Sequence, residues 1–556
     1  MPTAPELKVI RREFERDIDV LLALENNVVV DNTPPLFFGF SLGQLLTFHG
    51  DNNRDLREKL YRVYMKYCPA LSQGYLLGWS GVAGELAVAQ QQDIRMDGSI
   101  VGKNEHFAVN DDVNRGHSSQ KKDKRRIGFF SRFFHSHHAS GYLLEGLIPL
   151  LVKRGYHVTV FVIDDAKYFD DMSLVLSMNA FHQADRGFER DGGHIDSIVF
   201  DADKLEGRVN AYPLLSSDYI RNKIRKDASE FVFLPSDMNS CAEAIRGAEL
   251  SLLVYTELGQ DPVSHFLSFA RLAPAQALFI GDGDTSGVPS IDYIIVSDNV
   301  GLALPDTSYS ETVFKMRGLG TVFADNYAEA SLLLSKSPRS ALLERARFAE
   351  MLGLPRAAHL YAVANSLQSL HPKFDDVLVK ILSQDRLGYV IILDAANRTT
   401  LQRQYLRRLA DQSGKLDLES SGGGVFVVEQ RVVFYSSVDR EKNLYAIAAA
   451  HVLLEPLRTS GFLGTLQALA LGIPVVSLKD PESRMSGRFG QALYSMMNYS
   501  KLVVATTGEY VQTALQLVHN NKLRAEHSQQ LFQRRASLFG DAVRVAEDWD
   551  NFIGIL

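Results

Sequence analysis

Two series of short apolar runs, each alternating with amphipathic segments, constrain the fold more than any other feature of the sequence. The first series begins at Arg126 and the second near residue 358, and both are rich in β-branched and aromatic residues. In chain order they read RIGFF, YHVTVFVI, DSIVF, SLLVY, QALFI and DYIIV, then HLYAV, GYVIIL, VVFY, HVLLEP, PVVSL and KLVVAT. Continuous apolar strands that alternate with helices indicate parallel sheets covered on both faces. We therefore predict an α/β fold with two doubly wound, Rossmann-like domains that face each other across a cleft.

This alternation divides the 556 residues into segments with different expected structures. Before the first strand, apolar residues recur at three- and four-residue intervals, which is typical of helices. A polar stretch ending in KKDKRR follows and predicts a linker or loop. The predicted segments are a helical region at 1–88, a polar linker at 89–125, a first Rossmann-like domain at 126–325, an interdomain segment at 326–355, a second Rossmann-like domain at 356–530 and a C-terminal helix at 531–556.

Charge and cysteine content argue against several classes of protein. The net charge is -7 and 22% of the residues are charged, so no overall basic field attracts nucleic acid or anionic lipid. Nucleic-acid binding by KKDKRR is the minority alternative to a solvated charge run. Cys68 and Cys241 lie far apart without a CxxC partner, which argues against a disulfide framework and a structural zinc site. The charged N-terminus and the lack of an apolar run of about 20 residues predict a cytoplasmic or nuclear protein without a membrane span.

Nucleotide-binding signatures narrow the function further. Neither series has GxGxxG after its first strand, and no GxxxxGKS or GxxxxGKT occurs, which argues against dinucleotide dehydrogenases and phosphate-loop NTPases. Residues 456–478, PLRTSGFLGTLQALALGIPVVSL, instead predict a loop, a helix and a buried strand. The first turn of such a helix offers free N–H groups and the positive end of the helix dipole, which suit a pyrophosphate. Two facing α/β domains can hold a nucleotide donor on one side and an acceptor on the other.

A longer pattern carries a resemblance to a known family. Residues 253–299 contain RLAPAQ, GDGDTSG and DYIIVSDN in that order. They resemble the RLAPxQ, GxPxTSG and DYxIxSD motifs of the O-linked N-acetylglucosamine transferase-like family, the SPINDLY type with bacterial members poor in tetratricopeptide repeats. The resemblance covers roughly residues 125–540 and continues through YSETVFKMRGLG, HPKFDDVLVKIL, VVFYSSVDREKNLYAIAAAHVLLEP and ALALGIPVVSL.

This resemblance implies a cytoplasmic glycosyltransferase of the GT-B type that needs neither a metal nor a cofactor. Such an enzyme moves a sugar from a nucleotide diphosphate sugar to a protein side chain, and is thus an enzyme of protein glycosylation. The resemblance favours UDP-GlcNAc as the donor substrate, and a Ser, Thr or Asn side chain of a protein or peptide as the acceptor. The first domain would face the acceptor and the second would bind the nucleotide sugar.

The residues that the resemblance implies for donor binding are only partly present. Where the family has a GNTS or GHTT run and then an acidic residue, this chain has a run from Gly461 to Thr465 that includes Gly464, and Gln467 at the acidic position. The backbone N–H groups and the Thr465 hydroxyl are kept, whereas one hydroxyl and the carboxylate are not.

The lysine that the family uses at the leaving diphosphate is also replaced. Its QxLxKxxP run corresponds to NSLQSLHP, which places Asn365 and Ser366 near the Gln and Ser369 on the Lys. A lost charge beside the departing diphosphate would cost about 2 to 4 kcal/mol of transition-state stabilisation.

Three further positions match the family better. Arg440, in SSVDREKN, falls where the family has a basic residue or His near the base, and Arg488, in SGRFGQAL, matches an Arg after the PVV strand. A structural salt bridge is the alternative for Arg488. The run FFSRFFHSHHASGYLLEGL places the family's His on His138, which could accept or relay the acceptor's proton near neutral pH. His138 and Ser369 are therefore the predicted catalytic positions.

Two motifs suggest a metal, and we interpret neither as a metal site. His135 and His137 lie beside His138, but no Cys, Asp or Glu is paired with them at a zinc-binding spacing. The run GDGD at 281–284 resembles a metal-binding DxD, yet it stands where the family has GHP or GYP, before residues that fit a tight turn. The sequence therefore predicts no metal ligand.

Two functions remain open from the sequence. The first is an active glycosyltransferase. The second is a weakened or inactive relative that keeps the cleft as a nucleotide- or peptide-binding module, which the residues at Ser369, Leu463 and Gln467 motivate. A scaffold whose cleft binds nothing is a third, less favoured alternative.

Overall fold

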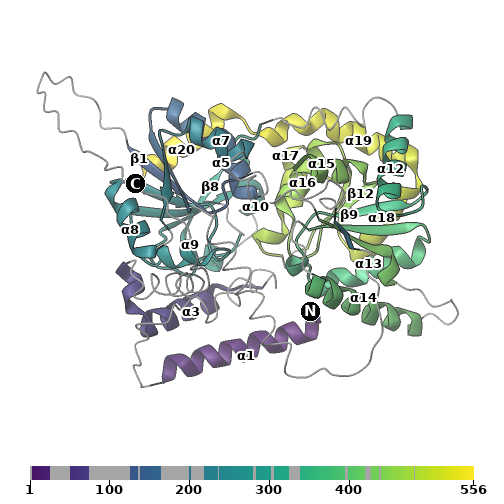
Figure 1. The fold of residues 1–556 in the computed structure, drawn as a ribbon, viewed down its shortest axis with the longest axis horizontal. Coiled ribbons are helices and arrows are strands. Elements are labelled where there is room, and N and C mark those ends of the chain that lie inside the picture. The colour runs from purple at the N-terminus through teal and green to yellow at the C-terminus, as the bar shows by residue number, and fades with distance from the viewer. Residues whose placement is uncertain are drawn as a thin grey trace, which may run out of the picture.

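The protein consists of two α/β halves placed side by side (Figure 1). The computed structural model describes residues 3–24, 51–73, 125–135, 138–163, 199–201, 218–235, 237–279, 283–301, 306–324, 338–394, 399–419, 428–436, 440–480 and 483–556. Each half is built on a seven-stranded sheet whose neighbouring strands pair in parallel. The predicted pair of doubly wound domains is therefore confirmed.

The first sheet has the strand order β4-β2-β1-β5-β6-β7-β8. Its strands are β1 (Arg126–Phe130), β2 (His157–Ile163), β4 (Glu230–Leu234), β5 (Leu252–Tyr255), β6 (Ala275–Phe279), β7 (Tyr293–Ser297) and β8 (Thr312–Met316). The central strands form because continuous apolar runs bury both faces: Ile127 pairs with Val158 on one side and with Leu252 on the other, and all three are buried. From β1 the chain adds β2 and β4 outward on one side of β1. It then returns to add β5, β6, β7 and β8 outward on the other side.

The second sheet has the order β14-β13-β12-β9-β10-β11-β3. Its strands are β9 (His359–Val363), β10 (Gly388–Leu393), β11 (Val432–Ser436), β12 (Val452–Leu454), β13 (Val475–Leu478), β14 (Val503–Val504) and β3 (Val199–Asp201). Tyr361 pairs with Val390 in β10 and with Val452 in β12. The chain again fills one side first, through β11, and then the other side from β12 outward.

Strand β3 corrects the prediction for the run DSIVF. That run was predicted within the first series, yet β3 pairs in parallel with β11, with Val199 opposite Phe434. It therefore extends the edge of the second sheet, although it lies between β2 and β4 in the chain. A short strand carries too little pattern to say which sheet it joins, because edge pairing depends on backbone hydrogen bonds that any strand can offer.

Helices cover both faces of each sheet. Those of the first half are α5 (Ala139–Lys153), α7 (Tyr219–Asp227), α8 (Met238–Gly247), α9 (Pro262–Leu267), α10 (Asp298–Gly301) and the 3-10 turn η4 (Asp306–Ser308). Those of the second half are α12 (Pro338–Met351), η5 (Leu367–Ser369), α13 (Pro372–Gln384), α14 (Thr399–Glu419), η6 (Val428–Arg431), α15 (Arg440–Ala449), α16 (Phe462–Ala470), η7 (Met485–Gly487), α17 (Phe489–Met496), α18 (Thr507–His519), α19 (Asn521–Arg534) and η8 (Arg535–Phe539). None of the described helices is long and apolar enough to cross a membrane.

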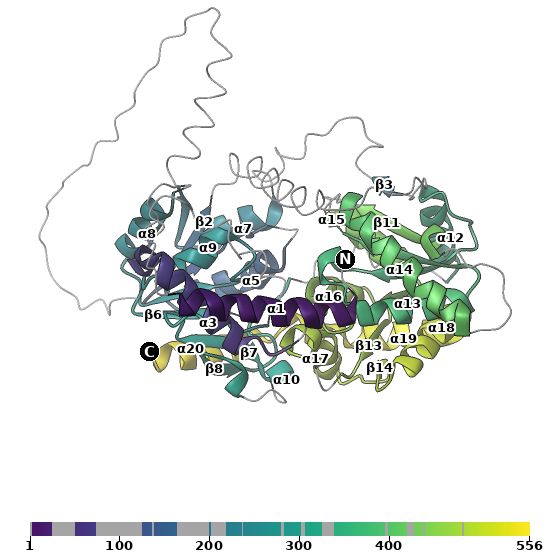
Figure 2. The ribbon, with the colours of Figure 1, turned by 90° about the horizontal axis from the view of Figure 1, so that it is seen from below.

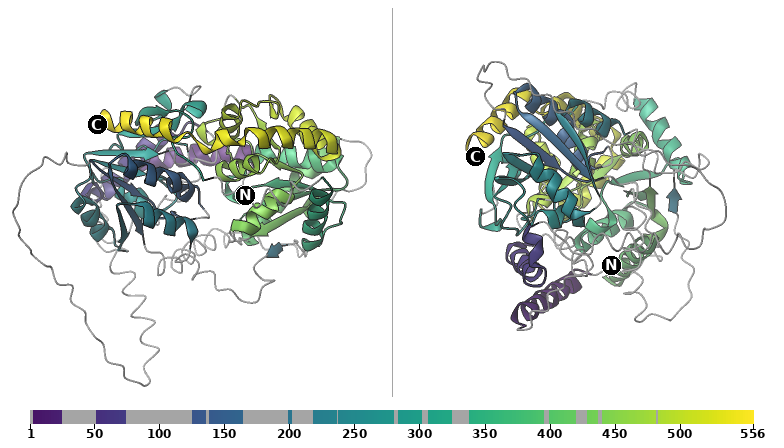
Figure 3. Two further views of the ribbon diagram at one scale, coloured as in Figure 1. Left: turned by 90° about the horizontal axis from the view of Figure 1, so that it is seen from above. Right: turned by 60° about the vertical axis from the view of Figure 1, so that its left-hand side comes forward.

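The C-terminal helix α20 (Ala542–Gly554) returns to the first half, where it packs on α5 and β8. Figure 3 shows the yellow C-terminal helices running from the second half to the first. The Trp549 ring is fully buried between Phe129, Phe279 and Phe552, and its Nε1–H donates to the Gly320 carbonyl oxygen at 2.8 Å. The C-terminal helix predicted at 531–556 is not one helix: α19 ends at Arg534, η8 follows, and α20 begins at Ala542. The place of α20 on the first sheet is an additional finding.

The N-terminal region is helical, as predicted for the parts that the structure describes. It contains α1 (Ala4–Ala23), α3 (Arg54–Tyr67) and the 3-10 turn η2 (Pro69–Gln73). Helix α1 lies alongside α3 on the underside of the molecule (Figure 2). The α3 residue Tyr64 packs its ring on Phe266 and Phe269 of the first half. The predicted linker at 89–125 lies almost wholly outside the described residues.

Candidate functional site

The site can be located from the strand orders alone. In an open parallel sheet, ligands bind beyond the carboxyl ends of the two strands where the direction of winding reverses. That point lies between β1 and β5 in the first sheet and between β9 and β12 in the second. The segments that follow these four strands are residues 131–138, 256–261, 364–371 and 455–461, and they contain or adjoin most of the predicted site residues.

The two carboxyl edges face each other. Gly283, after β6, lies so close to η7 of the second half that an added Cβ would be 2.7 Å from the Ser486 nitrogen. Arg484 Nη1 donates to Ser308 Oγ at 2.9 Å, and the rings of Phe323 and Phe462 lie 6.2 Å apart. These contacts join segments that follow the carboxyl ends of strands in both halves. The two halves therefore contact each other at the carboxyl edges of their sheets, in agreement with the prediction that they face each other.

The first turn of α16 has no side-chain cap, because its N-cap residue is Gly461. A Cβ at Gly461 would lie 2.3 Å from the Ala364 carbonyl oxygen, and one at Gly464 would lie 2.4 Å from the Ala364 Cβ. The turn is therefore pressed against the end of β9, which only glycine permits at these two positions. The leading N–H groups of a helix have no acceptor within the helix, and here the N-cap residue has no side chain to cap them.

Two hydroxyl groups beside this turn are buried without a hydrogen-bond partner among the described residues. They belong to Thr459, 6% exposed, and Thr465, 1% exposed. The Thr459 carbonyl oxygen is used, since Asn365 Nδ2–H donates to it at 3.2 Å and ties the end of β9 to the loop after β12. Gln467 is also buried on α16. An unpaired buried hydroxyl is costly unless a polar ligand or an ordered water completes its hydrogen bonding, and at this turn a polar ligand would supply that bond.

The Ser369 hydroxyl is hydrogen-bonded within its own turn. Its Oγ donates to the Ser366 carbonyl oxygen at 2.7 Å and lies 3.4 Å from Ser366 Oγ, which closes the short turn η5. The side chain is 2% exposed. The position that the resemblance assigns to a lysine thus carries a buried hydroxyl, beside Asn365, whose Oδ1 accepts from the Ser366 N–H at 3.1 Å.

Arginines gather near the same turn, in the loops after β12 and β13. Arg488 Nε donates to the Ser483 carbonyl oxygen at 2.7 Å, and desolvation, with the charge of Arg484, lowers the pKa of Arg488. Arg458 has a positive φ of 70° and pairs its Nε with Asp480 Oδ2 at 3.3 Å. Arg440 begins α15, and its side chain lies outside the described part of the structure.

Glu455, at the end of β12, is a buried residue that the sequence interpretation missed. Ser460 Oγ donates to its carboxylate, and a Cβ at Gly490 would lie 2.1 Å from Glu455 Oε2, so Gly490 leaves room for this carboxylate at the start of α17. Burial raises the pKa of Glu455. The available signal was an acidic residue ending the apolar run HVLLEP.

His138 caps α5 in the first half. Its Nδ1 accepts from the Ser140 N–H at 3.2 Å, and its Nε2 lies 2.8 Å from Gln260 Oε1, an acceptor, so Nε2 carries the proton. The ring stacks on Phe133 with centroids 4.6 Å apart. Both ring nitrogens are engaged, so accepting a proton from a substrate would require one of these contacts to exchange. The His135 ring lies beside the His138 ring, with centroids 6.3 Å apart, and His137 lies outside the described residues.

A second buried acid, Glu257, lies in the loop after β5 and was also missed. Its Oε2 accepts from Ser131 Oγ at 2.5 Å, from Thr256 Oγ1 at 3.0 Å and from Ser140 Oγ at 3.4 Å. Ser140 therefore connects the two side chains, because its Oγ donates to Glu257 and its N–H donates to His138 Nδ1. The group lies at the switch point of the first sheet, where the acceptor side was predicted.

The burial of His138 predicts a pH-dependent stability. Desolvation lowers the pKa of His138 to about 4, although the hydrogen bond to Gln260 opposes this. Because the folded pKa lies below the unfolded value of about 6.5, the native state holds fewer protons, and stability falls as the pH drops from 6.5 to 4. The His138→Asn substitution keeps an N-cap and removes the titration. Between these pH values, the variant should lose about 2 to 3 kcal/mol less stability than the native protein in urea unfolding. Parallel stability profiles would contradict this.

The GDGD run has a structural role at its last residue. Asp284 Oδ2 pairs with Arg57 Nε at 3.3 Å and accepts from Asn53 Nδ2 at 2.6 Å, so α3 holds this loop. Gly287 has a φ of 70°, and a Cβ there would lie 2.6 Å from the Arg57 Cβ. Asp282 lies outside the described residues. Helix α3 thus holds Asp284 in the loop after β6, and the positive φ of Gly287 agrees with the tight turn predicted after this run.

Solved structures share this architecture. A mutant of the O-GlcNAc transferase of Thermobaculum terrenum aligns with a TM-score of 0.55 and 17% identity, over 93% of this chain and 83% of that chain. Anabaena HepE in complex with UDP and glucose aligns at 0.45 and 12%, over 78% and 100% of the two chains, and the sucrose-phosphate synthase of Thermosynechococcus elongatus at 0.44 and 14%, over 78% and 99%. Of these three structures, only the O-GlcNAc transferase mutant has a TM-score above 0.5. This likeness shows the fold, which is of the GT-B type. No protein-family model and no curated protein matches the sequence.

Proposed function

We propose that this protein is a glycosyltransferase that binds a nucleotide diphosphate sugar at the first turn of α16 and transfers the sugar to a protein Ser, Thr or Asn side chain. The observation that carries the proposal is the uncapped turn at the switch point of the second sheet, with the unpaired buried hydroxyls of Thr459 and Thr465 beside it. We favour UDP-GlcNAc as the donor and membership of the O-linked N-acetylglucosamine transferase-like family. The shared fold with an O-GlcNAc transferase supports both choices.

Electrostatics supports a diphosphate at this turn. The N-terminus of a helix carries about half a positive charge, and its free N–H groups can hydrogen-bond phosphate oxygens. In the transfer, the bond between the sugar's anomeric carbon and the β-phosphate oxygen breaks while the acceptor atom attacks that carbon, so negative charge develops on the leaving diphosphate. Arg484 and Arg488 bring positive charge to the neighbouring loop. These groups take the place of the lysine that Ser369 replaces.

On the acceptor side, His138 and Glu257 are the groups that can take the acceptor's proton. Both lie at the switch point of the first sheet, linked through Ser140. We assign His138 the role of base or relay, with exchange of its bond to Gln260 when substrate enters. Ser369 would act on the donor side by turning its hydroxyl from Ser366 to the leaving group.

A binding module without catalysis is the alternative function, and one observation favours it. Ser369 and Gln467 are both buried where the resemblance expects a lysine and an acid, so two charged donor contacts are missing. Such a protein would bind the nucleotide sugar and leave it intact.

The Thr465→Val substitution tests the donor site. Valine has nearly the shape of threonine, so removing an unpaired buried hydroxyl should leave the unbound protein equally stable or slightly more stable. If Thr465 Oγ1 bonds a phosphate oxygen, affinity for UDP and UDP-GlcNAc in isothermal titration should fall about tenfold or more. Thr312→Val, at the exposed start of β8, is the matched control and should change neither quantity. If the native protein, Thr465→Val and Thr312→Val bound UDP and UDP-GlcNAc with equal affinity, Thr465 would not contact the donor.

Turnover separates the two functions. Transfer of labelled N-acetylglucosamine to protein by the native chain, persisting in EDTA, would establish a glycosyltransferase whose chemistry needs no divalent ion. Binding without transfer would favour the module. If the native protein bound no nucleotide sugar at all, both functions would be wrong.

A further inference from the structure

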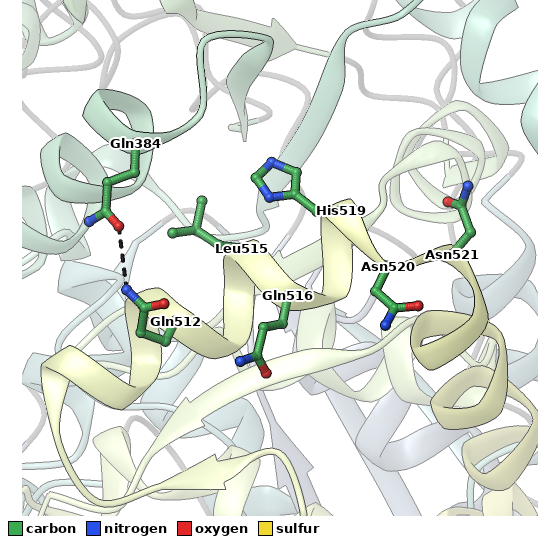
Figure 4. Close-up of a pocket in the computed structure, with 7 residues that line it drawn as sticks. All are labelled: Gln384, Gln512, Leu515, Gln516, His519, Asn520 and Asn521. Carbon is green, nitrogen blue, oxygen red and sulfur yellow. Dashed lines mark hydrogen bonds between the residues drawn. The ribbon is translucent and has the colours of Figure 1, made fainter.

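A second polar site lies near the amino ends of strands β9 and β10, whereas the α16 turn lies beyond the carboxyl ends of the strands of the same sheet. There a hollow of about 600 Å³ opens between the end of α13 and the end of α18. Figure 4 shows its amide side chains and the His519 ring, which projects from the last turn of α18 beside Leu515. The residues lining the hollow are Gln384, Gln512, Leu515, Gln516, His519, Asn520 and Asn521.

Beside this hollow, two histidines converge on one buried carboxylate. His359 Nδ1 lies 2.8 Å from Asp385 Oδ2, and His519 Nε2 lies 3.3 Å from the same oxygen. The three ligand atoms all lie within 4.8 Å of one another. They come from the start of β9, the residue after α13 and the end of α18, which are elements far apart in the chain but well fixed by the sheet.

We propose that His359, Asp385 and His519 bind one Zn²⁺ ion. Two imidazoles and one carboxylate are a common zinc ligand set, with metal–ligand distances of about 2.0 to 2.2 Å. Ligand atoms around a tetrahedral ion then lie roughly 3.3 Å apart. The contact between His519 and Asp385 already has this length. The contact between His359 and Asp385 must lengthen by about half an ångström, and the two histidine nitrogens, which lie within 4.8 Å of each other, must adopt the same separation.

The surroundings of Asp385 fit this role. Tyr361 O–H donates to Oδ2 at 2.8 Å and the Leu387 N–H donates to Oδ1 at 3.1 Å, so the carboxylate is oriented by groups outside the ligand set. Such outer partners fix the direction of metal ligands. The nearby Arg431 is directed to the backbone, with Nη1 donating to the Asp385 carbonyl oxygen at 2.6 Å.

A three-residue set leaves one position of a tetrahedral ion open. His519 is 46% exposed at its side chain and lines the hollow, so the fourth position is reached from there by water. The ion would join the end of α18 to β9 and to the end of α13, which stabilises the folded second half because the unfolded chain does not hold these ligands together.

The experiment uses the full-length chain, freed of metal with a chelator, and Zn²⁺ alone as the probe. Isothermal titration should give one tight site per chain, and Zn²⁺ should raise the Tm. His519→Gln should weaken the affinity about tenfold or more and abolish the Tm rise. His157→Gln is the matched control, since His157 Nε2 lies 3.6 Å from a carboxylate, that of Glu230, without a third ligand in the described structure. It should bind Zn²⁺ as the native protein does.

Co²⁺ provides a second readout that does not depend on stability. The native protein should give the visible absorption of four-coordinate Co²⁺, and His519→Gln should not. The proposal would be overturned if His519→Gln bound Zn²⁺ as the native protein does, or if the native protein showed no saturable binding. The three residues would then form only a hydrogen-bonded cluster. UDP affinity should be unchanged in His519→Gln. A wrong zinc proposal would therefore appear in the metal titrations, whereas a wrong proposed function would appear in the UDP titration of the native protein.

Discussion

Replacing Trp549 with alanine should destabilise the first half by about 3 to 5 kcal/mol, the range found when a large aromatic side chain is removed from a core. The Trp549 ring is fully buried against Phe129, Phe279 and Phe552. Its loss also leaves the Gly320 carbonyl oxygen without the donor that it has at 2.8 Å. The substitution therefore combines a cavity with an unpaired buried acceptor.

Urea unfolding, followed by circular dichroism, measures this change. Val543→Ala is the matched control, because Val543 lies on the same helix and is 67% exposed. It should change the free energy of unfolding by less than about 0.5 kcal/mol. If Trp549→Ala unfolds at the same urea concentration as the control, then α20 does not contribute to the core of the first half, contrary to the packing described.

Replacing Gly461 with alanine should abolish donor binding and cost about 1 to 3 kcal/mol of stability. The new Cβ would lie 2.3 Å from the Ala364 carbonyl oxygen, so the loop after β12 must move away from the end of β9. That movement displaces the Thr459 carbonyl oxygen from Asn365 and shifts the first N–H groups of α16. A site that binds phosphate through backbone groups does not tolerate such a shift.

Gly414→Ala is the control for this substitution. Gly414 lies in α14 with nothing within 4 Å of an added Cβ, so alanine should stabilise the helix by up to about 1 kcal/mol and leave UDP affinity unchanged. Isothermal titration and thermal unfolding of both variants measure the two effects. Native affinity in Gly461→Ala would mean that the first turn of α16 is only a well-packed helix start.

The sequence predicted the architecture because the central strands bury both faces and so consist of uninterrupted apolar runs. The edge strands β4 and β8 were missed because their patterns are half exposed, with Phe233 44% exposed in β4. The start of α16 was predicted from its glycine and strand context. How Gly461 and Gly464 press on Ala364 could not be predicted, since those contacts join two strands nearly a hundred residues apart in the chain.

Side-chain clusters were harder to predict than strands. Glu455 and Glu257 stand as single acidic residues at the ends of apolar runs, and only the fold surrounds them with hydroxyl groups. The cluster of His359, Asp385 and His519 has no motif spacing, because three separate elements supply one ligand each. Sequence patterns record local periodicity, whereas such clusters depend on which strand ends become neighbours.

The position of α20 has a consequence for synthesis on the ribosome. The second sheet, from β9 to β14, emerges before the helix that fills the core of the first half. Early chains therefore expose Phe129 and Phe279 until residues 542–554 leave the exit tunnel, while the second half can already fold. Domains usually fold in the order in which they are made, and here the half that begins first is completed last.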